Sequence, residues 1–492
     1  MSIRMVVVLF LNFYTTRVLL SNLGVEDYGV YNVVAGFVTM FSFLSTSMSN
    51  GIQRFFNFEY GKNGSSGANK VFNTAVIIQL ILAVIIVCIS EFIGIWYIRE
   101  KMVIPSTRVF AAHWVFQFSL ISFICTILQV PFVAAVMAHE NLNFYALISV
   151  VDAILKLLVV FLLQLLGADR LIMYGFLVSM ISVINLFIYA VYAREHYLEI
   201  RFRKTFDKDL FLSMLGFSGW NCFGSFAGVM KEQGINLVLN FFCGPIVNAA
   251  RGVASQINGG LQSFVQNISV PIRPQVVKSY AIGNFKHCLN LTFSLSKLSC
   301  CIIYLLSLPI VLEIDYILDV WLKGNIPEHT SSFVFIVILV SYINNLNSAV
   351  SGIVHASGKM RNYQVVTSII SLLCIPGAYI ALLIGSSPEV ALLMVFIFAM
   401  LSQMAALFIL RTIIDFKLSD YFKHVLWPFL ELVLMTVLLP LVPRYLMPQS
   451  FLRLVIVAGV SFIASLLVIY LKVLTDAEKE IINQLAFKLK RK

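Results

Sequence analysis

The sequence predicts an all-α membrane protein of about 14 transmembrane helices. Hydrophobic residues make up 60% of the 492 residues and charged residues only 12%, whereas a soluble domain usually carries about 25% charged residues. A single soluble core cannot enclose so much apolar surface, because cores stop growing at about 250–300 residues. Lipid must therefore be the solvent for most of the chain. We expect helices rather than a β-barrel, because the apolar runs are long and lack the ten-residue alternation of barrel strands.

The predicted spans follow from the length of the apolar runs. About 20 predominantly apolar residues are needed to cross about 30 Å of hydrocarbon. The first run carries Arg17 and has no small-residue cleavage site, so we expect it to be the first span rather than a cleaved signal peptide. The spans are predicted at 3–22, 28–54, 70–98, 107–138, 142–166, 170–193, 210–242, 246–272, 287–312, 331–355, 362–385, 388–411, 421–443 and 450–474.

The distribution of lysine and arginine predicts the orientation. Loops that follow even-numbered spans are basic, and loops that follow odd-numbered spans are poorer in bases and often acidic. Arg99, Lys101 and Arg108 are exceptions. The positive-inside rule then places both termini in the cytoplasm. The basic residues of the even-numbered loops and the tail include Lys62, Lys70, Arg194, Arg201, Arg203, Lys204, Lys208, Lys278, Lys286, Lys359, Arg361, Arg411, Lys417, Lys423, Lys488, Lys490, Arg491 and Lys492.

Several other function classes are not indicated. The net charge of +11 does not indicate nucleic-acid binding, because the bases lie in short loops rather than on a polar domain. The eight cysteines lie mostly in apolar runs and have no CxxC spacing, which is typical of small apolar residues rather than of disulfides or metal ligands. The P-loop and HExxH motifs are absent from the sequence. We therefore expect no enzyme, cofactor or metal site.

A basic, polar linker at about 194–209 divides the chain. It predicts an N-terminal lobe of spans 1–6 at 1–203 and a C-terminal lobe of spans 7–12 at 204–415, with two extra spans and a basic tail at 416–492. The chain reads GVEDYGVYNVVAGF after span 1 and GPIVNAARGVASQI after span 7. The separation between Gly24 and Arg54 along the chain is nearly the same as the separation between Gly244 and Arg273. Transporters are often built from such repeats, with the substrate between them.

The segment from Arg17 to Asn32, RVLLSNLGVEDYGVYN, is followed by FSFL from Phe41 and QRFF from Gln53. This pattern resembles the polysaccharide-biosynthesis flippases of the multidrug/oligosaccharidyl-lipid/polysaccharide exporter (MOP) superfamily. Their usual pattern, R-x-L-x-x-x-L-G-x-x-x-Y-G-x-Y, joins spans 1 and 2. The layout of 12 plus two spans is also similar to that family over the whole chain.

The resemblance implies a fold and a function. The fold is two six-helix lobes around a central cavity, as in the multidrug exporters (MATE-like), plus two C-terminal helices. The function is movement of undecaprenyl-diphosphate-linked oligosaccharide from the cytoplasmic to the periplasmic leaflet of the bacterial inner membrane, for O-antigen, capsule or exopolysaccharide synthesis. The implied partners are this lipid-linked oligosaccharide, membrane lipid and a polysaccharide polymerase, with no nucleic acid.

Ionisable residues inside spans are the candidate site residues, because each costs about 2.5–3.5 kcal/mol at a helix centre unless it has a partner or a wet cavity. Arg17 and Arg251 each lie seven residues from a glycine at the outer end of a span, or about 10 Å inside. Guanidinium groups bind phosphate oxygens in a bidentate fork. The resemblance adds that lipid II flippases use arginines of spans 1, 2 and 8. We therefore expect a cationic cavity that binds the diphosphate, formed by Arg17, Arg251, Lys231, Arg54 and Arg273.

Simpler roles stay open for several of these residues. Asp152 and Lys156 are spaced i, i+4 and could neutralise each other, or Asp152 and Glu232 could couple transport to an ion. Lys231 could pair with Glu232, although adjacent residues point to different faces. Arg54, Arg273 and Lys297 lie toward the cytoplasmic ends of their spans, where they could extend to the membrane surface.

Two other functions remain as alternatives. A cation-coupled multidrug exporter of the same superfamily binds organic cations and should have an acidic cavity, whereas the deep charges here are mostly basic. A membrane glycan polymerase, ligase or glycosyltransferase usually needs a large periplasmic loop or an acidic catalytic loop, and the sequence has neither.

Overall fold

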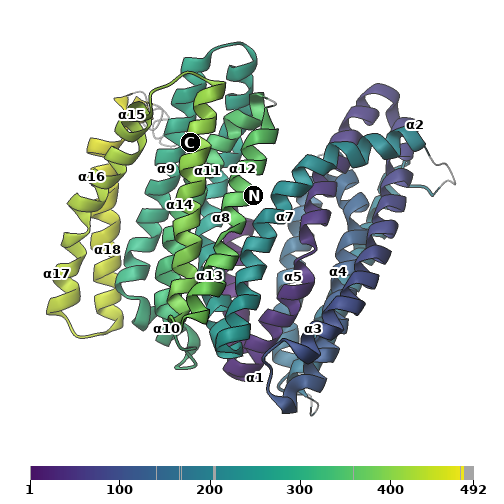
Figure 1. The fold of residues 1–492 in the computed structure, drawn as a ribbon, viewed down its shortest axis with the longest axis horizontal. Coiled ribbons are helices and arrows are strands. Elements are labelled where there is room, and N and C mark those ends of the chain that lie inside the picture. The colour runs from purple at the N-terminus through teal and green to yellow at the C-terminus, as the bar shows by residue number, and fades with distance from the viewer. Residues whose placement is uncertain are drawn as a thin grey trace. The chain divides into compact units, whose positions relative to one another are not determined.

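The computed structural model describes residues 2–139, 141–165, 167, 169–202, 207–357, 359–476 and 478–480, and these residues are almost entirely helical. Contacts divide the chain into two compact units, which are described separately (Figure 1). Unit 1 comprises Met1–Val253, Asn325–Thr330 and Ser368–Phe398, and unit 2 comprises Ala254–Gly324, Ser331–Thr367 and Ala399–Lys492. The lobe boundaries predicted from the sequence are a different division and stay a prediction.

Unit 1 is built mainly from the first seven helices. Figure 1 shows α1, α4, α5 and α7 as neighbouring long helices, and the starts of α8 and α14 also belong to this unit. The helices are α1 (Ser2–Thr39), α2 (Ser42–Ile89), α3 (Ile95–Glu100), α4 (Val109–Ala138), α5 (Leu142–Leu162), α6 (Arg170–His196), α7 (Lys208–Cys243), α8 (Pro245–Ala281), α13 (Cys374–Leu383) and α14 (Pro388–Ile413).

Unit 2 contains the rest of α8 and α14 and most of the other helices of the C-terminal half, whereas α13 and the last turn of α12 belong to unit 1. Helices α16 to α18 pack beside α9 (Figure 1). The remaining helices are α9 (Phe285–Leu312), α10 (Ile314–Leu322), α11 (Thr330–Ser357), α12 (Met360–Leu372), α15 (Leu418–Tyr421), α16 (Trp427–Thr436), α17 (Leu438–Leu446) and α18 (Phe451–Val468).

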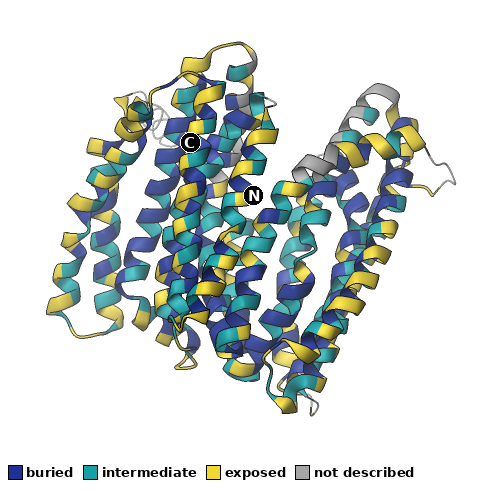
Figure 2. Ribbon diagram, viewed as in Figure 1, coloured by how far each residue is buried: buried dark blue, intermediate teal, exposed yellow. Residues whose placement is uncertain are grey.

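The helical membrane fold predicted from the sequence is confirmed. In the described part of the chain, 11 helices are long and apolar enough to cross a membrane. Exposed residues lie along many of the helices (Figure 2). They include large apolar side chains such as Phe110 on α4 and Leu434 on α16, as expected where lipid is the solvent. The count of 14 spans stays a prediction. Helix α1 runs through both the first predicted span and the start of the second, and the long helices α7 and α8 are not among the 11.

Two glycines with nearly the same backbone conformation support the internal repeat. Gly24, inside α1, has φ 80° and ψ 169°, and Gly244, between α7 and α8, has φ 79° and ψ −176°. Side chains other than hydrogen are strongly disfavoured there, so this region is essentially restricted to glycine. Gly64 and Gly283, which follow at similar intervals, also have positive φ values of 61° and 76°. The two sequence segments that resemble each other therefore bend in the same way at corresponding positions.

The GVEDYGVYN segment has a packing role that explains its residues. An added Cβ at Gly29 would lie 1.9 Å from the Pro245 carbonyl oxygen, so only glycine lets α1 approach the start of α8 this closely. Tyr31 packs edge-to-face on Tyr174 of α6, with ring centroids 4.8 Å apart.

An ion-pair network next to this segment explains why Arg108 lies in a loop that the positive-inside rule predicts to be poor in basic residues. The Arg108 guanidinium lies 2.6 Å from Asp27 Oδ2 and 2.6 Å from Asp169 Oδ2. Asp27 is buried, with 6% of its side chain exposed. Arg108 therefore neutralises two carboxylates of unit 1 and connects α1, α4 and α6, rather than acting as a topology signal.

Two buried ion pairs hold the C-terminal helices in unit 2. Lys297 of α9 is 4% exposed and donates to Glu478 Oε2 at 2.8 Å and to the Val473 carbonyl oxygen at 2.9 Å. The expectation that Lys297 could extend to the membrane surface is therefore wrong, because the segment after α18 brings a carboxylate to it. At the other end, Arg453 of α18 lies 2.6 Å from Glu313, whose side chain is fully buried.

We predict that Gly29→Ala destabilises the protein. The new methyl group must push the α8 backbone at Pro245 aside, and such overpacking costs about 1–3 kcal/mol. The midpoint of thermal unfolding of the purified protein would measure this loss. The control is Gly228→Ala on α7, where an added Cβ meets nothing within 4 Å; we expect it to be neutral or slightly stabilising. Equal midpoints for the two variants would contradict the close α1–α8 contact.

We also predict that part of the stability depends on pH through Glu478. Burial alone would raise its pKa, but hydrogen bonds from Lys297, Ser294 and Thr475 and the Lys297 charge outweigh burial and hold the pKa below its ordinary value. The stabilisation is then present above the ordinary carboxyl pKa and is lost as pH falls through the lowered one.

Unfolding midpoints of wild type and Glu478→Gln should therefore differ most near neutral pH and converge on acidification, because protonated glutamate resembles glutamine. Asp476→Asn is the control, since that carboxylate is fully exposed; its profile should follow wild type. A difference between wild type and Glu478→Gln that does not change with pH would contradict the proposed role of the ionised carboxylate.

Candidate functional site

The candidate site lies in unit 1, where α7 and α8 run back along each other from the bend at Gly244. Asn236 and Glu232 are one turn apart on α7, and Asn248 and Arg251 are one turn apart on α8. Asn248 Nδ2 donates to Asn236 Oδ1 at 2.6 Å and to its carbonyl oxygen at 2.8 Å. Arg251 Nη2 donates to the Glu232 carbonyl oxygen at 2.7 Å and to its Oε2 at 3.1 Å. We call these four residues the polar ladder.

Helix α1 packs against the polar ladder through small and amide residues. An added Cβ at Gly252 would lie 2.9 Å from Asn32 Nδ2, and one at Gly36 would lie 2.7 Å from Gln233 Oε1. Asn236 Nδ2 donates to the Asn32 carbonyl oxygen at 3.4 Å. The amides therefore satisfy polar groups of α1 and α7 inside a membrane helix bundle, where water is scarce.

Arg251 is the most buried cation of the site. Only 9% of its side chain is exposed, and its Nη1 atom is buried without a hydrogen-bond partner in the described structure. Asn248 Oδ1 is also buried without a partner. An unsatisfied buried donor costs about 1–3 kcal/mol, more for a charged group. A strong donor and an acceptor are thus both available for a ligand or for water.

Glu232 gives the ladder an accessible edge. Its side chain is 53% exposed although its partner Arg251 is almost completely buried. Glu232 lies eleven residues before the end of α7 at Cys243, or about 16 Å inside at 1.5 Å per residue. An ionised carboxylate at that depth is costly against hydrocarbon, so its exposed face requires water or a polar ligand. The pairing of Glu232 with Lys231, which the sequence left open as an alternative, is not found; Glu232 pairs with Arg251.

No hydrogen bond or ion pair between described residues joins the other predicted cations to the polar ladder. Arg17 on α1 and Lys231 on α7 are both partly exposed, and neither belongs to the ion pairs found among the described residues. Arg54 lies in α2 and Arg273 in α8, but their side chains lie outside the described residues. The predicted set of five cations as one cavity therefore stays a prediction.

Asp152 and Lys156 form the pair that their spacing predicts. Lys156 Nζ lies 2.8 Å from Asp152 Oδ2, and Asn185 Nδ2 of α6 donates to Asp152 Oδ1 at 2.7 Å. With both oxygens of the carboxylate engaged, Asp152 belongs to a structural ion pair within α5 that is also hydrogen-bonded to α6.

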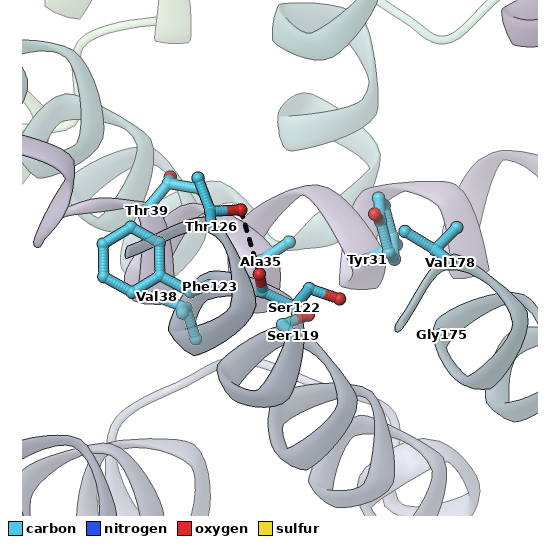
Figure 3. Close-up of a pocket in the computed structure, with 10 residues that line it drawn as sticks. All are labelled: Tyr31, Ala35, Val38, Thr39, Ser119, Ser122, Phe123, Thr126, Gly175 and Val178. Atoms are coloured by element: carbon cyan, nitrogen blue, oxygen red, sulfur yellow. Dashed lines mark hydrogen bonds between the residues drawn. The ribbon is translucent and has the colours of Figure 1, made fainter. Parts of the chain in front are cut away.

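A small hydroxyl-lined cavity of about 150 Å³ lies between α1, α4 and α6 (Figure 3). Thr126 Oγ1 donates to the Ser122 carbonyl oxygen at 3.0 Å, while Ser122 Oγ is buried without a partner in the described structure. A cavity of this size and polarity can hold several water molecules. It carries no charged side chain, and its polar lining residues are Tyr31, Thr39, Ser119, Ser122 and Thr126.

A wider cleft of about 690 Å³ lies between α2 and α7, at the end that the sequence predicts to face the cytoplasm. Its charged lining residues are Glu59, Lys70, Asp207 and Asp209. Three carboxylates against one lysine make it unsuited to an anion as highly charged as pyrophosphate. Within the described residues, no group of three or more His, Cys, Asp or Glu side chains could hold a metal ion.

The sequence interpretation missed the amide half of the polar ladder and the hydroxyl cavity. Asn32, Asn236, Asn240 and Asn248 are all unusual in apolar runs, and this was the available signal. Asn240, for example, bonds both backbone groups of Val103, at 3.0 and 3.3 Å. Only the fold, however, determines which amides face each other.

Comparison with known proteins identifies the fold. No protein-family profile and no curated protein sequence matches the chain, but solved structures do. The lipid II flippase MurJ in an inward closed conformation is similar with a TM-score of 0.71 and 14% identity, over 95% of this chain and 97% of that chain. An inward-facing multidrug resistance MATE family transporter of the MOP superfamily has a TM-score of 0.69 and 13% identity, over 84% of this chain and 96% of that chain.

A third similar structure is a MOP superfamily transporter from Pyrococcus furiosus, in which reversed polarity of the binding pocket suggests a different function. Its TM-score is 0.62 at 14% identity, over 84% of this chain and 94% of that chain. All three are transporters, so the chain has the fold of MOP superfamily transporters and flippases. The MurJ structure covers about a tenth more of this chain than the other two structures. This additional coverage is about as long as the segment Leu418–Val473, which contains the last two candidate membrane spans.

Proposed function

We propose that the chain is a flippase that translocates undecaprenyl-diphosphate-linked oligosaccharide from the cytoplasmic to the periplasmic leaflet by alternating access. The product would supply a surface polysaccharide such as O-antigen, capsule or exopolysaccharide, with a polysaccharide polymerase as the next partner. The proposal includes a bacterial inner-membrane location with both termini in the cytoplasm, which rests on the distribution of basic loops.

The observation that carries the proposal is the buried guanidinium of Arg251 with Nη1 unpartnered. A charged donor in a membrane helix bundle favours an anionic ligand, and the planar fork of arginine matches two phosphate oxygens. Lys231 and Arg17, which are both partly exposed, would add positive charge if the transport cycle brings them to the same ligand. The similarity to the MurJ fold over nearly the whole chain also supports a lipid-linked substrate.

The direction of transport is compatible with the membrane potential. A potential that is negative inside favours outward movement of an anion by about 2.3 kcal/mol per charge per 100 mV. The isoprenoid chain would remain in lipid, so only the diphosphate and sugars need a polar path.

A cation-coupled multidrug exporter is the second candidate function. The similarity to MATE transporters and the half-exposed carboxylate of Glu232 favour it. Against it, Glu232 is already paired with Arg251, which lowers its ability to bind an organic cation.

We predict that Arg251→Ala abolishes most of the transport. Loss of a charge-assisted hydrogen bond of about 1.5–3 kcal/mol weakens binding roughly 10- to 100-fold. In cells, surface polysaccharide should fall while cytoplasm-facing lipid-linked intermediate accumulates, and Arg251→Lys should recover only part of the activity, because lysine lacks the fork. Arg17→Ala should act in the same direction. The control is Arg411→Ala, at an exposed helix end. Loss of drug resistance with unchanged polysaccharide would instead identify the exporter.

A further inference from the structure

The ion pair in the polar ladder is asymmetric in exposure. The side chain of Arg251 is 9% exposed and the side chain of Glu232 is 53% exposed. Both bonds from Arg251 to Glu232 come from Nη2, at 2.7 and 3.1 Å, while Nη1 is unpartnered. The exposed member of the pair is therefore the anion, and it occupies only one side of the guanidinium. Nη1 is itself buried, so a second anion would compete for the same cation once alternating access opens the bundle beside it.

We propose that Glu232 is an exchangeable internal anion for Arg251: the diphosphate displaces its carboxylate, and the displaced carboxylate takes up one proton from solution. This rests on the proposed function, because it assumes that Arg251 binds the diphosphate. The reaction is a protonation only. The carboxylate gains H⁺ when the ligand binds and releases it when the ligand leaves, and no covalent bond in the ligand changes.

The charges around Glu232 explain why displacement would be linked to a proton. The charged and titratable groups near it are Arg251 on α8, Lys231 on α7 and Cys374 on α13, whose thiol lies within electrostatic range of all three charged residues. Helix α1 presents amides and glycine to this part of α7. Without a ligand, the Glu232 carboxylate accepts a hydrogen bond from Arg251 Nη2. With a diphosphate on Arg251, that bond is lost and two negative groups are close together, so proton uptake by the displaced carboxylate would relieve the repulsion.

Lys231 does not replace Arg251 as the partner of the displaced carboxylate. It is adjacent to Glu232 in α7, and adjacent helical residues point to different faces. The exposed fraction of Glu232 gives protons from solution access to the carboxylate. Binding should therefore take up protons and become tighter as pH falls, which is the sign expected when the complex binds more protons than the free protein.

The test is isothermal titration of the purified full-length protein in detergent with geranylgeranyl diphosphate at pH 8, where this probe is almost fully ionised. Titrations in two buffers of different ionisation enthalpy give the number of protons taken up per bound probe. Wild type should take up a measurable fraction of one proton, and Glu232→Gln should take up almost none. Removal of the internal competitor should also make Glu232→Gln bind about tenfold tighter.

Two further variants complete the experiment. Glu91→Gln, whose carboxylate accepts from Gln117 and not from the polar ladder, should match wild type in affinity and proton uptake. Glu232→Ala should behave as Glu232→Gln and replaces it if that variant does not fold. The proton uptake of wild type is itself decisive: a value of zero at pH 8 overturns the exchange.

The same titrations separate this inference from the proposed function. If Arg251→Ala binds the probe as tightly as wild type, or if wild type does not bind it, the proposed diphosphate site is wrong. If binding depends on Arg251 but Glu232→Gln equals wild type in both affinity and proton uptake, the site stands and the exchange is overturned.

Discussion

The cost of an isolated charge in a membrane is the constraint on which much of this structure depends. Three of the deeply placed charges have partners on segments that are distant in sequence or opposed across a bend. Arg251 pairs with Glu232, Lys297 with Glu478 and Arg453 with Glu313. Breaking such a pair leaves a buried charge uncompensated, which is strongly destabilising even where the pair itself adds little. The ion pairs therefore specify which helices lie together within each unit, while apolar contacts supply most of the packing.

The bends at glycine make these pairings geometrically possible. At Gly24 and Gly244 the chain adopts a conformation open essentially only to glycine and reverses direction within one residue. The reversal at Gly244 sets α7 beside α8 so that one turn of each helix, Asn236 to Glu232 and Asn248 to Arg251, faces the other. Gly29 then lets α1 approach the start of α8. A site that needs a buried guanidinium is thus built from close backbone contacts rather than from a long loop.

The candidate site combines a buried cation with an anion that solvent can reach. If Glu232 exchanges with the substrate, the site is neutralised both when it is empty and when it is occupied, and the membrane bundle avoids an isolated charge in either state. Arg251 and Asp152 differ in whether a hydrogen-bonding atom is left without a partner. Arg251 has one such atom, Nη1, whereas both carboxylate oxygens of Asp152 are bonded, to Lys156 and Asn185. A charge with every hydrogen-bonding atom satisfied is suited to stabilising the fold, whereas one with a free donor is suited to binding.

Composition and the lengths of apolar runs alone determined that this is a helical membrane protein, because lipid demands long apolar helices and leaves a strong signal in sequence. Spacing along one helix also predicted the Asp152–Lys156 pair. The partners of Arg251, Arg108 and Lys297 come from residues 19, 81 and 181 positions away, and no local pattern connects such residues. Only the tertiary structure decided these pairings, because they depend on how bends and close helix contacts bring distant side chains together.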